Sequence, residues 1–240
     1  MLPSRGWVKF EKGESKMNSP LKYLLTRIGE RVSPQLVYKM NAAINYLEVG
    51  RWMHANGYKV RHRANRREEL FDIAGSRVRE REVLYMEFGV FRGAATRYWS
   101  RLLRNPKSKL HGFDSFEGLP ESWLPHPQGH FSVHGEVPEI DDARVQFFKG
   151  WFEETLPRYT LPHHDVLVMN FDADLYSSTI FVLDTLADRI VPGTLIYFDE
   201  FNHQFHELRA FDEFIKKTGA RFEVLGATRT LEHVLFRRSS

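Results

Sequence analysis

The spacing of apolar residues changes once along the chain, near residue 82. Between residues 19 and 57, apolar positions recur every three or four residues, as on one face of a helix: Leu21, Leu24, Leu25, Ile28, Leu36, Met40, Ala43, Ile44 and Leu47. Ser33-Pro34 is a favourable N-cap and first-turn pair, so we expect two helices here. With a third segment rich in Arg and Glu over 64–81, they predict a helical N-terminal appendage over residues 1–80.

From residue 83 onward, short apolar runs alternate with helical patterns. Five runs have the continuous apolar character of parallel strands buried on both faces: Val83–Phe88, Lys109–Asp114, Arg144–Lys149, Asp165–Phe171 and Thr194–Phe198. Two further runs, Arg221–Leu225 and Leu231–Phe236, are joined by a turn too short for a parallel crossover, which predicts an antiparallel hairpin. The pattern predicts an α/β fold over residues 81–240, with a doubly wound, Rossmann-like and mostly parallel sheet.

Composition excludes several kinds of chemistry. The 240 residues include no cysteine, which excludes disulfides, thiolate zinc sites and cysteine nucleophiles. No apolar run approaches the roughly 18 residues of a membrane span, and residues 1–13 contain no apolar signal segment. We therefore expect a soluble, cytoplasmic protein with no membrane partner.

Charge is distributed unevenly along the chain. Residues 1–110 hold 23 Lys and Arg against 10 Asp and Glu, while the remainder holds 11 against 21. A basic front half can contact nucleic acid, a membrane surface or an anionic substrate, but a solvated helical surface explains it more simply. No nucleic-acid-binding motif accompanies the charge, so we do not expect a nucleic-acid partner.

The residues that end each expected strand carry the candidate chemistry, because open doubly wound sheets bind ligands beyond the carboxyl ends of their strands. After the first strand, Gly89 and Gly93 allow either close approach of a ligand or a tight packing turn. Asp114, after the second strand, can accept hydrogen bonds from both hydroxyls of a ribose. Trp151 and Phe152, after the third, can sandwich a flat base, although core packing explains them equally well.

Four carboxylates follow the fourth and fifth strands, and they would repel one another in an empty site. They are Asp172, Asp174, Asp199 and Glu200. A hard cation with oxygen ligands, magnesium first, is the natural compensation, and helix capping or solvent exposure is the alternative. His203, four residues after Asp199, could act as a general base.

A long polar loop over 115–142 separates the second and third strands. His126, His130 and His134 are spaced by four, as metal ligands on a helix would be, but Pro125, Pro127 and Gly129 break any helix there. We therefore interpret the loop as a mobile lid over the pocket.

Taken together, these motifs resemble the macrocin O-methyltransferase family of class I S-adenosylmethionine-dependent methyltransferases. The matching segments lie between residues 65 and 236 in the family's order: 87–93, 112–120, 150–152 with 155–157, 172–179 and 197–200. The resemblance implies a seven-stranded sheet with an antiparallel last strand. Residues 1–64 carry no resemblance to a named family.

The resemblance also implies roles for single residues. Glu87, Gly89 and Gly93 would surround the methionine part of the cofactor, Asp114 the ribose, and Trp151 with Phe152 the adenine. The flanking residues assigned to the same site are Phe91, Ser115, Gly150 and Asp172. Magnesium would be held by Asp172, Asp199 and Glu200, where the family usually has a second aspartate in place of the glutamate.

The expected activity is S-adenosylmethionine-dependent O-methyl transfer, magnesium-dependent, onto a hydroxyl of a small molecule such as a sugar or natural product. Asp172 or His203 would take the hydroxyl proton. The alternatives are a metal-independent N- or carboxyl-methyltransferase, a catalytically silent binding protein of the same fold, and a nicotinamide-dependent oxidoreductase, against which the missing G-x-G-x-x-G counts. The N-terminal helices could also pair two subunits as a homo-oligomer.

Overall fold

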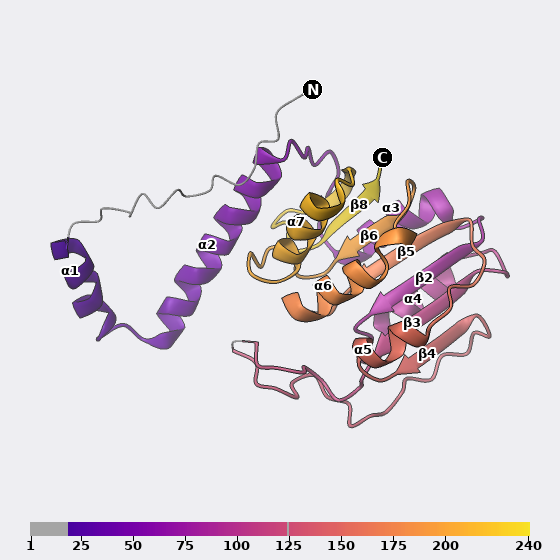
Figure 1. The fold of residues 1–240 in the computed structure, drawn as a ribbon, viewed down its shortest axis with the longest axis horizontal. Coiled ribbons are helices and arrows are strands. Elements are labelled where there is room, and N and C mark those ends of the chain that lie inside the picture. Colours follow the sequence, from indigo (N-terminus) through magenta and orange to yellow (C-terminus); the bar gives the residue numbers. More distant parts are fainter. Residues whose placement is uncertain (1–18, 124) are drawn as a thin grey trace. The chain divides into compact units, whose positions relative to one another are not determined.

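The computed structural model describes residues 19–123 and 125–240, and it confirms the doubly wound α/β fold (Figure 1). The sheet has the order β1-β7-β8-β6-β5-β2-β3-β4. Its strands are β1 (Arg63–Ala64), β2 (Val83–Phe88), β3 (Lys109–Asp114), β4 (Val145–Lys149), β5 (Val166–Phe171), β6 (Leu195–Phe198), β7 (Phe222–Thr228) and β8 (Val234–Arg238). Only β8 is antiparallel to its neighbours, β6 and β7, as expected for the terminal hairpin.

The described sheet has eight strands, so the expected count of seven is corrected by one. The additional strand, β1, has only two residues and pairs in parallel with β7. Such a short strand leaves no periodic pattern in the sequence, because its position depends on a distant partner. The Ala227 N–H donates to the His62 carbonyl oxygen at 3.0 Å, next to the paired residues.

Helices cover both faces of the sheet, and side chains alternate between the two faces along each strand. The helices are α1 (Ser19–Gly29), α2 (Pro34–Ala55), α3 (Arg67–Val78), α4 (Ala94–Leu102), α5 (Phe152–Thr155), α6 (Tyr176–Thr185) and α7 (Glu207–Thr218), with short 3-10 turns at Leu156–Arg158 and Ala187–Arg189. One buried cluster joins alternate strand residues to α6, α7 and the end of α2. The other joins the intervening residues to α3 and α4.

Strand register brings the residues that matter to one level. Phe88 pairs with Phe113 on one side and with Phe171 on the other, and Phe171 pairs with Phe198. Neighbouring rings in this row lie 5.0–5.5 Å apart between centroids. Each of the four strands therefore delivers its next residues to the same edge of the sheet.

The compact unit that contains the sheet begins at Ile44, inside α2, and residues up to Ala43 form a separate unit. This boundary lies earlier than the expected start of the main domain at residue 81. The reason is burial, since Val49, Trp52 and Met53 of α2 are core residues. The part of the expected appendage before residue 19, including residues 1–13, lies outside the described residues.

In α1, the large apolar side chains are exposed: Leu21, Tyr23, Leu24, Leu25 and Ile28. Their exposure supports pairing of the N-terminal helices between subunits, which stays a prediction.

No helix in the described ranges combines the length and the apolar character that crossing a bilayer requires.

Trp52 fixes the end of α2 to the core, and its removal tests the boundary at residue 44. Its Nε1 donates to Asp212 Oδ1 at 2.8 Å, and its ring packs against Tyr58 and Phe201. We expect Trp52→Ala to lower the free energy of unfolding by about 3–5 kcal/mol, as buried tryptophans do. Leu47→Ala, in the same helix but 74% exposed, should cost less than about 0.5 kcal/mol. Urea unfolding of the full chain measures both, and equal effects would mean that α2 is not part of the core.

Candidate active site

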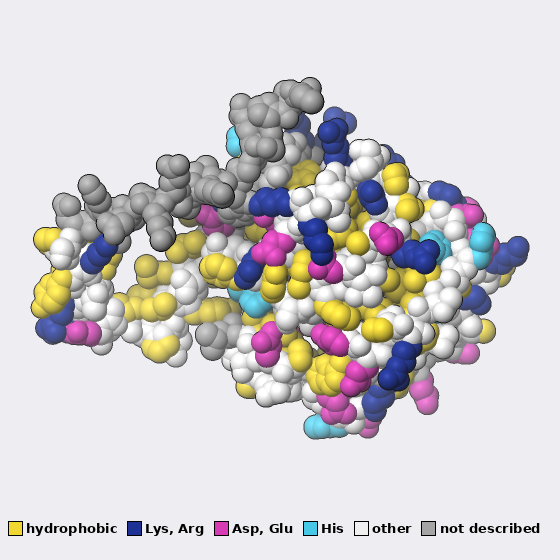
Figure 2. Space-filling view, in the orientation of Figure 1, with side chains coloured by type: hydrophobic (Ala, Val, Ile, Leu, Met, Phe, Trp, Pro, Cys, Tyr) yellow, Lys and Arg dark blue, Asp and Glu magenta, His cyan; other side chains and the backbone are white. Residues whose placement is uncertain are grey.

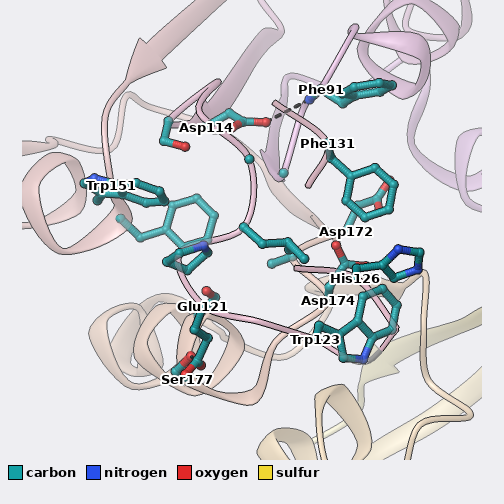
Figure 3. Close-up of a pocket in the computed structure, with 18 of the residues that line it drawn as sticks. Phe91, Asp114, Glu121, Trp123, His126, Phe131, Trp151, Asp172, Asp174 and Ser177 are labelled. Atoms are coloured by element: carbon teal, nitrogen blue, oxygen red, sulfur yellow. Dashed lines mark hydrogen bonds between the residues drawn. The ribbon is translucent and has the colours of Figure 1, made fainter. Parts of the chain in front are cut away.

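A cavity of about 920 Å³ opens at the carboxyl ends of the strands (Figure 3). Proteins hold small ligands in pockets of about 300–1,000 Å³. Twelve of the residues singled out from the sequence line it: Gly89, Phe91, Asp114, Ser115, His126, Gly150, Trp151, Phe152, Asp172, Asp174, Asp199 and Glu200. Glu87, Gly93 and His203 are not among its lining residues. Residues from five different strand ends thus meet at one cavity.

The backbone conformation and surroundings of residue 89 require a glycine. It has φ +90°, and a Cβ placed on it would lie 1.9 Å from the Asp172 carbonyl oxygen. Only glycine lets the turns after β2 and β5 approach this closely. Gly93, with φ +73°, begins α4 facing Pro138. Gly89 therefore serves a tight packing turn, and close approach of a ligand to either glycine stays a prediction.

Asp114 joins two of the turns that frame the cavity. Its Oδ2 accepts hydrogen bonds from the backbone N–H groups of Val90 and Phe91, at 2.7 and 2.8 Å. Its Oδ1 accepts from the N–H of Phe116 at 2.7 Å. A carboxylate has about four lone-pair positions, so capacity for a ligand hydroxyl remains. The residue predicted to bind a ribose also holds the loops around that position.

Glu87 lies in the protein interior, 1% exposed. Its Oε2 accepts hydrogen bonds from the Tyr85 hydroxyl at 2.9 Å and from Thr96 Oγ1 at 2.6 Å. Burial raises its pKa to about 7, against the opposing effect of these two hydrogen bonds. Its direct contact with a cofactor stays a prediction.

The turn after β4 brings two aromatic rings to the cavity wall. Gly150 donates its N–H to the Asp114 carbonyl oxygen at 3.0 Å, which fixes the start of this turn. The Phe152 ring meets Phe88 edge-on at 5.8 Å and belongs partly to the core. In Figure 3, Trp151 lies on the opposite side of the cavity from Trp123 and His126. Trp151 is therefore better placed than Phe152 to face a planar ligand.

The loop over 115–142 forms the other wall. Between its described residues, strand-like pairing is limited to the single bridge Trp123–His126. The loop folds back on itself through a hydrogen bond from the Leu119 N–H to the His130 carbonyl oxygen, at 2.9 Å. Ser177 Oγ of α6 donates to Glu121 Oε1 at 2.7 Å, which ties the loop to the main domain. Its movement as a lid stays a prediction.

Three of the four acids that follow the strand ends have raised pKa values. Burial, followed by the charges of Asp199 and Asp114, raises the pKa of Asp174 to about 7. Burial and the charges of Asp199 and Asp174 raise the pKa of Glu200 to about 8. Burial and the charges of Asp199 and Asp174 also raise the pKa of Asp172, and Arg67 opposes them. The expected crowding of carboxylates is present.

Asp199 differs because it has partners. Its Oδ1 accepts a hydrogen bond from the Tyr197 hydroxyl at 2.6 Å and lies 3.2 Å from His233 Nδ1. Burial acts to raise its pKa, but the hydrogen bond and charge of His233, together with Arg67, lower it overall. Asp199 is therefore the acid of this group most strongly held as a carboxylate.

Arg67 is a site residue that the sequence did not reveal. Its Nη1 lies 3.3 Å from Asp199 Oδ1 and 3.5 Å from Asp172 Oδ2. Several arginines precede and follow it in the sequence, and no spacing distinguishes it from them. Its position depends on β1 and α3, which bring this part of the chain to the strand ends.

This arrangement does not fit the expected magnesium site. Asp172 and Asp199 share one guanidinium, and Asp199 also has the Tyr197 hydroxyl and His233 as partners. In the part of the chain that the structure describes, no three His, Asp or Glu side chains are grouped to hold a metal ion. Residues 126–134 are among the described residues, so the three histidines of the loop are not grouped to hold a metal ion either. The rings of His126 and His130 stack with their centroids 4.3 Å apart.

His203 lies near the cavity but outside its lining. Its ring is 5.9 Å from that of Trp123 and 4.5 Å from that of His206, centroid to centroid. Its Nδ1 is buried without a hydrogen-bond partner among the described residues, and burial lowers its pKa. A role for His203 as general base stays a prediction.

Comparison with known proteins identifies relatives that match part of the chain. Over 137 residues, the chain is 29% identical to 8-demethyl-8-(2,3-dimethoxy-alpha-L-rhamnosyl)-tetracenomycin-C 4'-O-methyltransferase of Streptomyces olivaceus, covering 48% of this chain and 52% of the relative. Over 92 residues, it is 34% identical to mycinamicin III 3''-O-methyltransferase of Micromonospora griseorubida, covering 38% and 34%. The chain thus spans about half or less of the length of these two curated relatives.

Among solved structures, the calicheamicin methyltransferase CalS11 has a similar fold, with a TM-score of 0.56 at 25% identity over 72% of this chain and 80% of that one. The family model described as macrocin-O-methyltransferase (TylF) matches residues 64–225, which include the segment that supplies Arg67 and each strand end around the cavity. The chain belongs to the macrocin-O-methyltransferase family.

Proposed function

We propose that this protein transfers a methyl group from S-adenosylmethionine to a hydroxyl oxygen of a small molecule, a sugar or natural product. The observation that carries the proposal is the meeting of residues from five strand ends at one cavity. Membership of the family supports the donor and the reaction. The two curated relatives are O-methyltransferases named for natural-product substrates, which supports the acceptor class.

The charge of the cavity supports a cationic donor. Its acidic lining residues are Asp114, Glu121, Glu153, Asp172, Asp174, Asp199 and Glu200. Among the described lining residues, Arg67 alone is an Arg or Lys. Such a lining creates a negative potential, which favours a ligand with a positively charged centre.

When bound, S-adenosylmethionine supplies a methyl group activated by a sulfonium. Asp114 would accept hydrogen bonds from the ribose hydroxyls, and Trp151 would stack on the adenine. The 115–142 loop, held to α6 by the bond between Ser177 and Glu121, would limit the access of water. These residues align the reacting atoms, which is the main requirement of a displacement.

The acceptor hydroxyl must lose a proton as the new carbon–oxygen bond forms and the carbon–sulfur bond breaks. Asp172 lines the cavity and is the proposed proton acceptor. Because the acids do not fit a divalent cation as arranged, no part of this scheme depends on one.

The wall opposite Trp151 supports a ring-shaped acceptor with apolar faces. Trp123, His126 and Phe131 of the loop line the cavity, and the Phe131 ring meets Phe91 at 6.2 Å. Pockets for small molecules usually combine such aromatic walls with a few polar groups. Nucleic acid is a poorer match, because basic and acidic side chains are interspersed on the face of the compact unit seen in Figure 2.

Calorimetry with S-adenosylhomocysteine tests the donor, and transfer of labelled methyl to a panel of glycosides and phenols tests the acceptor. We expect one S-adenosylhomocysteine per chain and methylation of a hydroxyl. Binding without methylation of any compound class would favour a silent binding protein, and methylation of amines or carboxylates would favour the alternative transferases. No binding would contradict the proposal.

Trp151→Ala tests the donor position directly. Losing a stacked base costs about 1–3 kcal/mol, so we expect S-adenosylhomocysteine to bind roughly 5- to 150-fold more weakly. Phe205→Ala is the control, because this aromatic side chain is 61% exposed and lies outside the cavity lining. Calorimetry measures both, and unchanged affinity in Trp151→Ala would place the adenine elsewhere.

Ser177→Ala tests the link between the loop and α6. Removing a hydrogen bond of about 0.5–1.5 kcal/mol should raise the population of the open loop roughly 2- to 12-fold. Limited proteolysis within 115–142 should accelerate by a similar factor. Ser76→Ala is the control, because the Ser76 hydroxyl bonds only to its own helix, at the Ile73 carbonyl oxygen. Equal cleavage rates would show that the link does not restrain the loop.

A further inference from the structure

The Arg67 guanidinium lies where the sequence placed a divalent cation. Its Nη1 donates to Asp199 Oδ1 at 3.3 Å and forms an ion pair with Asp172 Oδ2 at 3.5 Å. These are the acids that end β6 and β5, the two strands expected to supply metal ligands. A positive charge is therefore already present between them, from within the chain.

Neighbouring structure fixes the backbone on both sides of Arg67. Three residues earlier, Ala64 is buried and pairs with Thr228 of β7. Four residues later, Phe71 is buried and packs its ring against Tyr197 at 4.9 Å. Tyr197 in turn donates its hydroxyl proton to Asp199, so the core that holds Arg67 also holds its carboxylate partner.

The guanidinium has donors left for a ligand. Arg67 lines the cavity, and its side chain is 28% exposed. Among contacts with the described residues, only Nη1 forms a hydrogen bond, while Nε lies 3.7 Å from Glu68 Oε1. Arginine has five N–H donors and stays charged at all accessible pH, so the remaining groups can bind an oxygen at the open side.

We propose that Arg67 replaces the divalent cation in this protein, binding the acceptor oxygen through its free N–H groups, so that methyl transfer requires no metal. This inference rests on the proposed function. The balance of the step is unchanged: the carbon–oxygen bond forms, the carbon–sulfur bond breaks, and the hydroxyl proton passes to a carboxylate. Arg67 cannot accept that proton, so its role is to hold the oxygen beside Asp172.

A metal ion and the guanidinium would compete for the same oxygens. Mn²⁺ serves as a probe that does not depend on activity, because electron paramagnetic resonance measures the free ion and gives the bound ion by difference. For the wild-type chain, we expect no stoichiometric Mn²⁺ binding, with or without S-adenosylhomocysteine. We also expect turnover on an acceptor from the panel to be unchanged in excess chelator. One tightly bound Mn²⁺ per chain, or loss of turnover in chelator, would overturn the inference.

Arg67→Ala adds a test of the positive role. Removing a donor to the reacting oxygen should lower kcat/KM roughly 100-fold, and added guanidinium ion should restore part of it. Arg66→Ala is the matched control, because that side chain is 75% exposed and outside the cavity lining. An Arg67→Ala variant as active as wild type in chelator would also overturn the inference.

Binding of S-adenosylhomocysteine distinguishes failure of this inference from failure of the proposed function. If it binds to the wild-type chain while Mn²⁺ also binds, the inference fails and the proposed function stands. If it does not bind at all, both fail. The wild-type Mn²⁺ measurement needs no variant, so it decides the question even where Arg67→Ala does not fold.

Discussion

Repulsion among carboxylates at the ends of β5 and β6 is the constraint on which the site depends. Parallel strands in register deliver Asp172, Asp174, Asp199 and Glu200 to one edge, and burial there penalises every charge. The protein meets this penalty unevenly. Asp199 gains Arg67, His233 and the Tyr197 hydroxyl, whereas Asp174 and Glu200 have raised pKa values of about 7 and 8. Asp199 is therefore the acid at this edge that is held most firmly as a carboxylate.

Glu207, which is hydrogen-bonded to Glu200, is a further buried acid with a raised pKa. It is fully buried at the start of α7, its Oε2 accepts the Glu200 N–H at 2.9 Å, and burial raises its pKa strongly. One hydrogen bond thus links the acid after β6 to the helix that packs beneath it. The charge of this region is controlled by the fold, through β1, α3 and α7, as much as by the strand ends themselves.

The sequence predicted the features that leave a local pattern. Buried parallel strands show as continuous apolar runs, and the terminal hairpin as a short link, so the sheet and its strand ends followed directly. What it missed depends on contacts between distant residues. β1 is defined by its pairing with β7, and the place of Arg67 by the path of β1 and α3.

The same distinction explains which contacts of the predicted site residues the sequence could indicate. Asp114 was identified by its position after a strand, but its hydrogen bonds to Val90, Phe91 and Phe116 could not be foreseen, because they join separate turns. The magnesium prediction was made from the acids alone, without the Arg67 guanidinium that lies between Asp172 and Asp199. A set of carboxylates implies a compensating positive charge, but it does not state whether an ion or a side chain supplies that charge.

Charge also bears on which class of acceptor the proposed function would use. The basic excess of residues 1–110 could have suited an anionic substrate, yet among the described lining residues only Arg67 brings a full positive side chain into the cavity. Its charge is already shared by Asp172 and Asp199. A phosphate or carboxylate would enter a cavity with seven acidic lining residues and meet repulsion from most of them. An uncharged hydroxyl compound avoids that cost and can still use the aromatic wall of Trp123 and Phe131, so the geometry favours a neutral acceptor over an anionic one.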